Sequence, residues 1–292
     1  MYVGVDVGGT FTDAVLLNNG LVLATAKVPT REDLLGSILE ALDVILKDVN
    51  KKDLKRIVFS TTMITNLIAE QKYDNVALLL IPGPGLKHEY YTFNTAVHIL
   101  SGAIDYRGRE VVPMNEREID ASLSNISLKG YHKVGVIGKF SPRNTSHEKY
   151  VAAIINDKYP QWQVELGSQI GGQLNFPRRV VTTYLTCATR EPYSYFVSSV
   201  RQALEKRQIT ADVFILKADG GTLPLDNSEE LPLETIFSGP AASTLGVQAL
   251  IPQGETAVVV DIGGTTTDLA LILSGQPLLS AKGAKVEEQL TQ

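Results

Sequence analysis

The segment Val3–Leu16, VGVDVGGTFTDAVL, recurs near the other end of the chain as Val258–Leu271, VVVDIGGTTTDLAL. Nine positions are identical in the two copies, which lie 255 residues apart. Solenoid repeats have periods of roughly 20–50 residues, so this spacing indicates instead two lobes that each begin with the same β-hairpin. The turn glycines Gly20 and Gly275 keep the same offset.

Each copy reads as a strand that ends in an aspartate, followed by two glycines, a threonine and a second strand. Glycines permit a sharp turn and close approach of the backbone, and consecutive N–H groups can then face a phosphate. Threonine hydroxyls can add further donors. The predicted phosphate cradle consists of Gly8, Gly9, Thr10, Gly263, Gly264 and Thr265, with hydroxyls from Thr12 and Thr267.

The strand-end aspartates Asp6 and Asp261 are the first candidates for chemistry. Carboxylate oxygens suit Mg²⁺, so we expect these two to hold the ion through its waters or to orient a nucleophile. Asp13 and Asp268 lie inside strands, where aspartate is disfavoured, and they face either the cleft or a backbone N–H. Two facing hairpins would grip a polyphosphate and exclude water when they close.

Composition excludes several other classes of protein. The 292 residues suggest about two domains, and the net charge of −5 argues against a basic nucleic-acid-binding face. Cys187 is the only cysteine, so the chain has no internal disulfide or thiolate metal cluster. There is no apolar run of about 18 residues, no Walker-type loop and no GxSxG motif. We expect a cytoplasmic protein with neither a membrane nor a nucleic-acid partner.

The hydrophobic pattern predicts an α/β protein. Residues 1–82 follow the order βββαβαβ, ending in a strand at 75–81, and form the core of a first lobe. Residues 83–250 are an inserted α/β region, loop-rich at 86–130, with a helix at 145–157 capped by Thr145-x-x-Glu148. Residues 251–292 begin a second lobe. The pattern leaves open whether 212–250 belongs to the insertion or to the first lobe.

The two hairpins resemble the phosphate-1 and phosphate-2 motifs of the acetate/sugar kinase–Hsp70–actin superfamily, and VDVGGTFTD resembles the N-terminal signature of the hydantoinase A/5-oxoprolinase family. The resemblance spans about residues 2–275 and implies ribonuclease-H-like, actin/hexokinase-type sheets. FPRRVVTT, ending at Thr183, departs from the family pattern. Other segments that carry the resemblance are STTMITN (Ser60–Asn66), FSPRNTSHE (Phe140–Glu148), KADGG (Lys217–Gly221) and SGPAA (Ser238–Ala242).

The resemblance implies ATP-dependent hydrolysis of a five-membered cyclic amide of the hydantoin or 5-oxoproline type. ATP and Mg²⁺ would be needed, because phosphorylation of the ring carbonyl turns its oxygen into a leaving group. A B-type hydantoinase subunit and a homo- or hetero-oligomer are the expected partners. In the family a long region follows phosphate-2, so we expect either a fragment or a short homologue whose cleft another chain completes.

Two other functions fit the same sequence. One is a small-molecule kinase or carboxylase-type subunit, and the other is a non-catalytic regulatory or scaffold subunit switched by nucleotide. Substrate contacts are expected at junctions that local capping or turns would explain equally well. These residues are Thr61, Thr62 and Asn66 after a strand, Asp219 and Gly220 in a tight turn, and Ser238 and Gly239 at a helix start.

Overall fold

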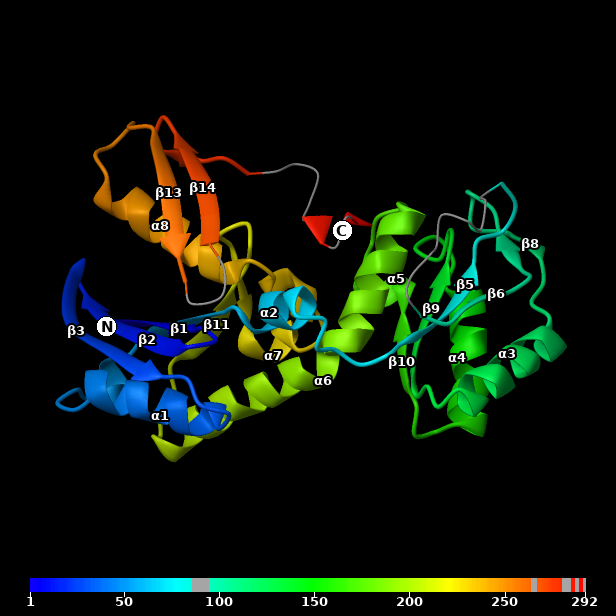
Figure 1. The fold of residues 1–292 in the computed structure, drawn as a ribbon, viewed down its shortest axis with the longest axis horizontal. Helices are drawn as coiled ribbons and strands as arrows, with labels where there is room; N and C mark the ends of the chain where they lie inside the picture. The colour runs from blue at the N-terminus through cyan, green and yellow to red at the C-terminus, as the bar shows by residue number, and fades with distance from the viewer. Residues whose placement is uncertain (86–94, 264–266, 280–284, 287–288, 291–292) are drawn as a thin grey trace. The chain divides into compact units, whose positions relative to one another are not determined.

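The computed structural model describes residues 1–85, 95–263, 267–279, 285–286 and 289–290 (Figure 1). The chain forms two compact units. Unit 1 comprises Met1–Gln71 and Arg190–Ser280, and unit 2 comprises Lys72–Thr189 and Ala281–Gln292. The chain therefore crosses between units after Gln71 and Thr189, and not at residues 82 and 250 as the sequence suggested.

Unit 1 contains a six-stranded sheet in the order β12-β11-β4-β1-β2-β3. β1, β2 and β3 form an antiparallel meander, while β4 pairs parallel to β1 and β11 pairs parallel to β4. Asn19 and Gly20 both have positive φ at the β2–β3 turn, as a type I′ hairpin requires. The strands are β1 (Tyr2–Val7), β2 (Phe11–Asn18), β3 (Leu21–Pro29), β4 (Arg56–Thr61), β11 (Asp212–Leu216) and β12 (Thr222–Pro224).

Period-two alternation sorts the side chains of β1 between the two faces of this sheet. Val3, Val5 and Val7 are buried, on the face that α1 (Leu34–Ile45) covers through apolar side chains such as Ile38. Gly4 and Asp6 therefore point to the other face. Unit 1 also holds α2 (Met63–Ala69), α7 (Leu225–Ser228), α8 (Ser238–Leu250) and the short 3₁₀ helices η1 (Lys51–Asp53) and η3 (Pro232–Thr235).

One predicted strand of the first core belongs elsewhere. The strand at 75–81 forms as β5 (Ala77–Ile81), but it lies in the sheet of unit 2, and β11 takes the place beside β4. The βββαβαβ assignment was thus wrong at its last strand, because a local hydrophobic pattern does not specify that β4 pairs with β11, 156 residues further along the chain. Strand β11 also assigns the segment after residue 212 to unit 1.

A second, three-stranded antiparallel sheet in unit 1 contains the repeat copy. It consists of β13 (Ala257–Ile262), β14 (Thr267–Leu273) and β15 (Gln276–Pro277), with α8 packed on one face (Figure 1). Val259 and Ile272 are buried on that face. The other face leaves large aliphatic side chains exposed, a feature typical of a surface that another segment or chain covers. They are Val258, Val260, Ile262, Leu269, Leu271 and Leu273.

Unit 2 is built on a parallel sheet in the order β10-β9-β5-β6. β5 and β9 are buried on both faces, as parallel strands covered by helices usually are. Its elements are β6 (Val97–Ile99), β7 (Ala103–Ile104), β8 (Glu110–Val112), α3 (Glu116–Leu128), β9 (Lys133–Gly138), α4 (Ser146–Lys158), β10 (Gln163–Leu166), α5 (Gly167–Ile170), β16 (Lys285–Val286) and β17 (Gln289–Leu290).

The expectation of a loop-rich segment at 86–130 was wrong for most of its described part. Residues 95–130 include three short strands and α3, which buries Ile119, Leu123 and Ile126 at helical spacing. Helix α6 (Phe176–Lys206) continues from unit 2 into unit 1. Within the described residues, no helix has the length and apolar character needed to cross a membrane.

Candidate functional site

The first hairpin presents a pair of carboxylates across its two strands. Asp6 on β1 lies opposite Asp13 on β2. The Ser60 hydroxyl on β4, which is in register with Asp6, donates a 2.6 Å hydrogen bond to the Asp6 carboxylate. Burial raises the pKa of Asp6 above its ordinary value, the Ser60 bond opposes this shift, and the Asp13 and Asp261 carboxylates add to it. Asp6 is thus a partly buried carboxyl close to other negative charges.

The second hairpin repeats this arrangement. Asp261 on β13 lies opposite Asp268 on β14, and the Ser243 hydroxyl of α8 donates to the Asp261 carboxylate. Burial, followed by repulsion from Asp261, raises the pKa of Asp268. Each copy therefore pairs two carboxylates with one serine hydroxyl, although the serine comes from a strand in one case and from a helix in the other. The Asp261 charge contributes to the raised pKa of Asp6, so the carboxylates of the two copies lie within electrostatic range of each other.

Asp13 lines a cavity together with Asp6 and Ser60, and its place in a nucleotide cleft stays a prediction. Its carboxylate forms an ion pair with Lys27 on β3, with a nitrogen–oxygen distance of 3.0 Å, and both side chains are substantially exposed. An exposed pair of this kind contributes little to stability.

Gly8 and Gly9 of the first hairpin are needed because a side chain would lack space there, and not because the backbone has a positive φ. Gly8 and Gly9 are absent from the described residues with positive φ. A Cβ on Gly8 would lie 3.0 Å from the Phe11 carbonyl oxygen, and one on Gly9 would lie 3.0 Å from Asn66 Nδ2. Alanine at either position would therefore displace the hairpin or its neighbour.

The predicted phosphate donors of this hairpin are only partly available. The Gly8 amide already donates to the Phe11 carbonyl at 3.0 Å. Thr12 is fully buried and its hydroxyl shares a hydrogen bond with that of Thr30, so the prediction of a free donor there was wrong. The exposed amides of Gly9 and Thr10 have no partner among the described residues, and these are the donors that a phosphate could accept from.

In the second hairpin, Gly263 and Thr267 are exposed at the ends of β13 and β14. Gly264 and Thr265 lie outside the described residues. No group of three or more His, Cys, Asp or Glu side chains in the described part of the chain is arranged to hold a metal by itself. Asp6 and Asp261 suit an ion held through water beside a bound phosphate, and their role as Mg²⁺ ligands stays a prediction.

A cavity of about 520 Å³ lies beside the first hairpin, and we name it the hairpin cavity. It brings together five of the predicted residues with side chains that the sequence did not single out. The predicted residues are Gly8, Gly9, Thr61, Thr62 and Asn66. The added ones include Arg31, Met63, Leu67 and Tyr195. Met63 lies within the STTMITN segment, while Arg31, Leu67 and Tyr195 belong to no motif and carry no local signal of a ligand site.

The strand-to-helix junction at Thr61 is a structural joint as well as a cavity wall. The Thr61 hydroxyl donates to the Val7 carbonyl at 3.2 Å. Ser238, at the start of α8, donates its hydroxyl to the Thr61 carbonyl and accepts from the Thr61 amide. A Cβ on Gly239 would lie 2.8 Å from Thr62 Cγ2. The buried start of α8 thus packs against β4 through Ser238 and Gly239, and their role toward a substrate stays a prediction.

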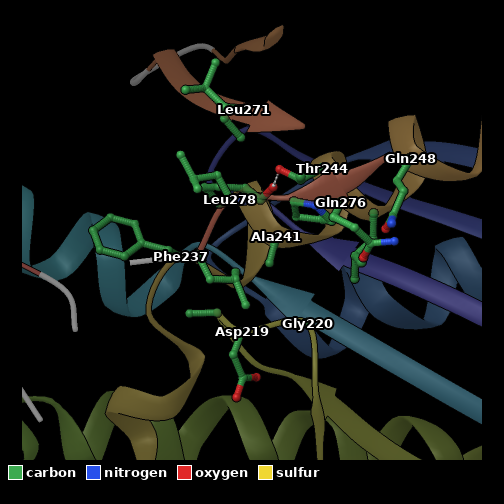
Figure 2. Close-up of a pocket in the computed structure, with 15 residues that line it drawn as sticks. Asp219, Gly220, Phe237, Ala241, Thr244, Gln248, Leu271, Gln276 and Leu278 are labelled. Carbon is green, nitrogen blue, oxygen red and sulfur yellow. Dashed lines mark hydrogen bonds between the residues drawn. The ribbon is translucent and has the colours of Figure 1, made fainter. Parts of the chain in front are cut away.

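Asp219 and Gly220 line a different cavity, of about 390 Å³, shown in Figure 2. Its other walls are mainly apolar and come from α8 and from β14 and the residues after it. The Asp219 carboxylate points away from the other labelled side chains in Figure 2. It accepts from the Gly221 amide and from Lys217, and the Gly221 bond is the main reason that its pKa is lowered. Asp219 therefore closes a tight turn in which Gly220 has φ +80°.

Comparison with known families and proteins gives a consistent result. A family model described as the hydantoinase/oxoprolinase N-terminal region matches residues 2–159, and one described as hydantoinase/oxoprolinase matches residues 179–290. The chain is 24% identical to an uncharacterized protein of Methanocaldococcus jannaschii over 95% of its length. It is 25% identical to the caprolactamase subunit alpha of Pseudomonas jessenii over 94%, and 22% identical to the acetone carboxylase beta subunit of Xanthobacter autotrophicus over 94%. It spans only 44%, 43% and 43% of these three relatives.

Two solved structures share the fold. A nucleotide-free acetone carboxylase superposes with a TM-score of 0.87 at 19% identity, covering 100% of this chain and 46% of that one. The ATP-dependent caprolactamase from Pseudomonas jessenii superposes with a TM-score of 0.70 at 24% identity, covering 93% and 43%. The chain thus has a mixed α/β fold with several sheets that these proteins also have.

Proposed function

Because the chain belongs to the hydantoinase/oxoprolinase family, we propose that it is the ATP-binding part of an enzyme that opens a cyclic amide. The observation that carries the proposal is the repeated hairpin, in which both copies hold a carboxylate pair with a serine hydroxyl beside glycine turns. The likeness to a caprolactamase subunit supports the choice of an amide as substrate.

We also propose that the six-stranded sheet is ribonuclease-H-like. An antiparallel meander of β1, β2 and β3 with two further strands parallel to β1 supports this topology. In that arrangement the sheet starting at β13 would begin a second lobe, and nucleotide would bind where the two hairpins approach each other.

In this proposal the chain's own residues bind and orient the phosphates. The amides of Gly9 and Thr10, which have no partner among the described residues, would donate hydrogen bonds to the terminal phosphate. Asp6 and Asp261 would hold Mg²⁺ through its waters. The ion would supply positive charge that neutralises the phosphate oxygens. Ser60 and Ser243 hold the two carboxylates in place, since each serine hydroxyl donates a hydrogen bond to one of them.

An unstrained lactam is a poor electrophile, and phosphoryl transfer removes this obstacle. The carbonyl oxygen bonds to the terminal phosphorus of ATP, the bridging phosphorus–oxygen bond breaks with its electron pair leaving on ADP, and the ring nitrogen loses its proton. Water then adds to the ring carbon and the carbon–nitrogen bond breaks, with a proton returning to nitrogen. A second water hydrolyses the acyl phosphate, which yields an amino acid and phosphate.

The relatives are named as subunits, which supports a hetero-oligomer in which a B-type hydantoinase subunit carries out the hydrolytic steps. The acetone carboxylase beta subunit among the relatives favours a second candidate, in which the phosphorylated oxygen belongs to a ketone and a carboxylation follows. The two candidates share the nucleotide site and differ in the acceptor.

Calorimetric titration with a non-hydrolysable ATP analogue tests the shared part. We expect Mg²⁺-dependent binding tighter than roughly 100 μM, about −5.5 kcal/mol, in the unaltered chain. Asp261→Asn should weaken it at least tenfold, because a carboxamide is a poorer partner for the hydrated ion. Equal affinity in the variant and the parent would remove Asp261 from the site, and binding that ignores Mg²⁺ would remove the ion.

A further inference from the structure

The hairpin cavity lies where a ligand of the phosphate hairpin would need its reaction partner. β1 and β4 are parallel neighbours, and their carboxyl ends at Val7 and Thr61 are in register at the cavity wall. Crevices beyond the carboxyl ends of parallel strands are common ligand sites in α/β proteins. Its volume of about 520 Å³ falls within the range of small-molecule pockets.

Asn66 carries the polar recognition in this cavity. Its carboxamide packs on the backbone of Gly9 and donates to the Thr62 hydroxyl at 3.3 Å. This leaves a second N–H and the carbonyl oxygen of the carboxamide, which together offer one donor and one acceptor. A lactam carries the complementary set, one carbonyl acceptor and one N–H donor, whereas a ketone carries only the acceptor. Met63, Leu67 and Tyr195 supply apolar surface for ring carbons.

The charges around the cavity argue against an anionic substrate. Arg31 is the only Lys or Arg among the described residues that line it, while Glu32 and Glu70 also line it. The Arg31 guanidinium forms an ion pair with Glu40 of α1 at 2.8 Å. A carboxylate on the substrate would therefore enter a site whose single cation already has an acidic partner, and it would gain little attraction there.

We infer that the hairpin cavity binds a neutral lactam, with Asn66 pairing to its N–H and carbonyl, and that it disfavours rings bearing a carboxylate. This inference rests on the proposed function for the phosphoryl-transfer step, and it deepens that proposal by naming the substrate class. Asn66 then distinguishes an amide from a ketone, and the Arg31–Glu40 pair distinguishes a neutral ring from an acidic one.

The test compares three rings of the same size as ligands of the full chain, with and without the ATP analogue. They are 2-pyrrolidinone, L-5-oxoproline and cyclopentanone, and ligand-observed NMR titration gives each affinity. We expect 2-pyrrolidinone to bind several-fold tighter than the other two. Asn66→Leu should weaken it about tenfold, since two hydrogen bonds are worth roughly 1.4 kcal/mol or more. The same change at exposed Asn125 of α3 should have no effect.

Glu40→Gln provides a test in the opposite direction, at an exposed position on α1 where loss of folding is not expected. Release of Arg31 should raise the affinity for L-5-oxoproline at least threefold and leave 2-pyrrolidinone unchanged. Tighter binding of L-5-oxoproline than of 2-pyrrolidinone by the unaltered chain, no lactam binding in either condition, or an unchanged affinity in Asn66→Leu would each overturn the inference. Lactam binding that persists while the ATP analogue fails to bind would refute the proposed nucleotide site and leave the cavity assignment standing.

Discussion

Removal of the Ser60 hydroxyl probes the state of Asp6 directly. In Ser60→Ala the Asp6 carboxylate loses a 2.6 Å hydrogen bond inside a partly buried site. A hydrogen bond to a charged group contributes about 1.5–3 kcal/mol, and one between neutral groups about 0.5–1.5 kcal/mol. We therefore expect Ser60→Ala to lower the free energy of unfolding by about 1.5–3 kcal/mol at pH 7.

The cost should depend on pH, and its sign follows from the Asp6 pKa. Burial raises this pKa above its ordinary value, so the favourable contribution of Asp6 is complete at low pH and is lost as the pH rises through the raised pKa. The Ser60 bond limits the loss because it favours the ionised form. Without it the pKa rises further, so the variant should lose stability more steeply than the parent between about pH 4 and 7.

Ser141→Ala is the matched control. The Ser141 side chain is also buried, but its hydroxyl donates to the neutral Gly138 carbonyl at 2.9 Å. Urea unfolding at several pH values should give a cost of about 0.5–1.5 kcal/mol for this control, with the same pH dependence as the parent. The reasoning on Asp6 fails if Ser60→Ala costs no more than Ser141→Ala at pH 7, or if its cost does not grow as the pH rises.

Three further predictions test the turn, the core and unit 2. Gly9→Ala places a Cβ 3.0 Å from Asn66 Nδ2, so it should weaken binding of the ATP analogue at least tenfold by calorimetry while unfolding changes by about 1 kcal/mol or less. Ile38→Ala should lower the urea-unfolding free energy by about 2–5 kcal/mol, since Ile38 is fully buried. Glu148→Gln should cost about 1–3 kcal/mol in thermal unfolding, because the buried Glu148 carboxylate accepts from the Gly138 and Ser168 amides at 2.7 and 2.9 Å and an amide nitrogen must now face one donor.

The sequence predicts elements well where local chemistry decides them. Strands β1, β2 and β3 were predicted because alternating valines and an Asn19–Gly20 turn specify a meander. Helix α4 was predicted with a capping box, but Thr145 makes no side-chain cap bond. Glu148 instead accepts from the end of β9 and from the start of α5. The pattern located the helix correctly and misread the role of its glutamate, because the partners of Glu148 lie in other elements.

Local hydrophobic patterns did not predict which distant strands pair with each other. Strand β5 and strand β11 are both short apolar runs, and nothing within either says which sheet it joins. The repeated hairpin was different, since two copies of one motif 255 residues apart carry long-range information in the sequence itself. For this reason the aspartate pairs were found, whereas Ser243, which completes the second pair from α8, was not.

Some of the predicted substrate residues make packing contacts within unit 1, and others line the hairpin cavity. Ser238 and Gly239 bind β4 to α8, and Asp219 closes a turn, so residues of these two motif segments support the structure of unit 1. Of the residues expected to contact substrate, Thr62 and Asn66 retain polar groups that line a cavity. Arg31 and Tyr195 line the same cavity and lie outside every motif. Substrate preference within this fold is therefore expected to follow the residues between the motifs, and substitutions there should change the acceptor without altering nucleotide binding.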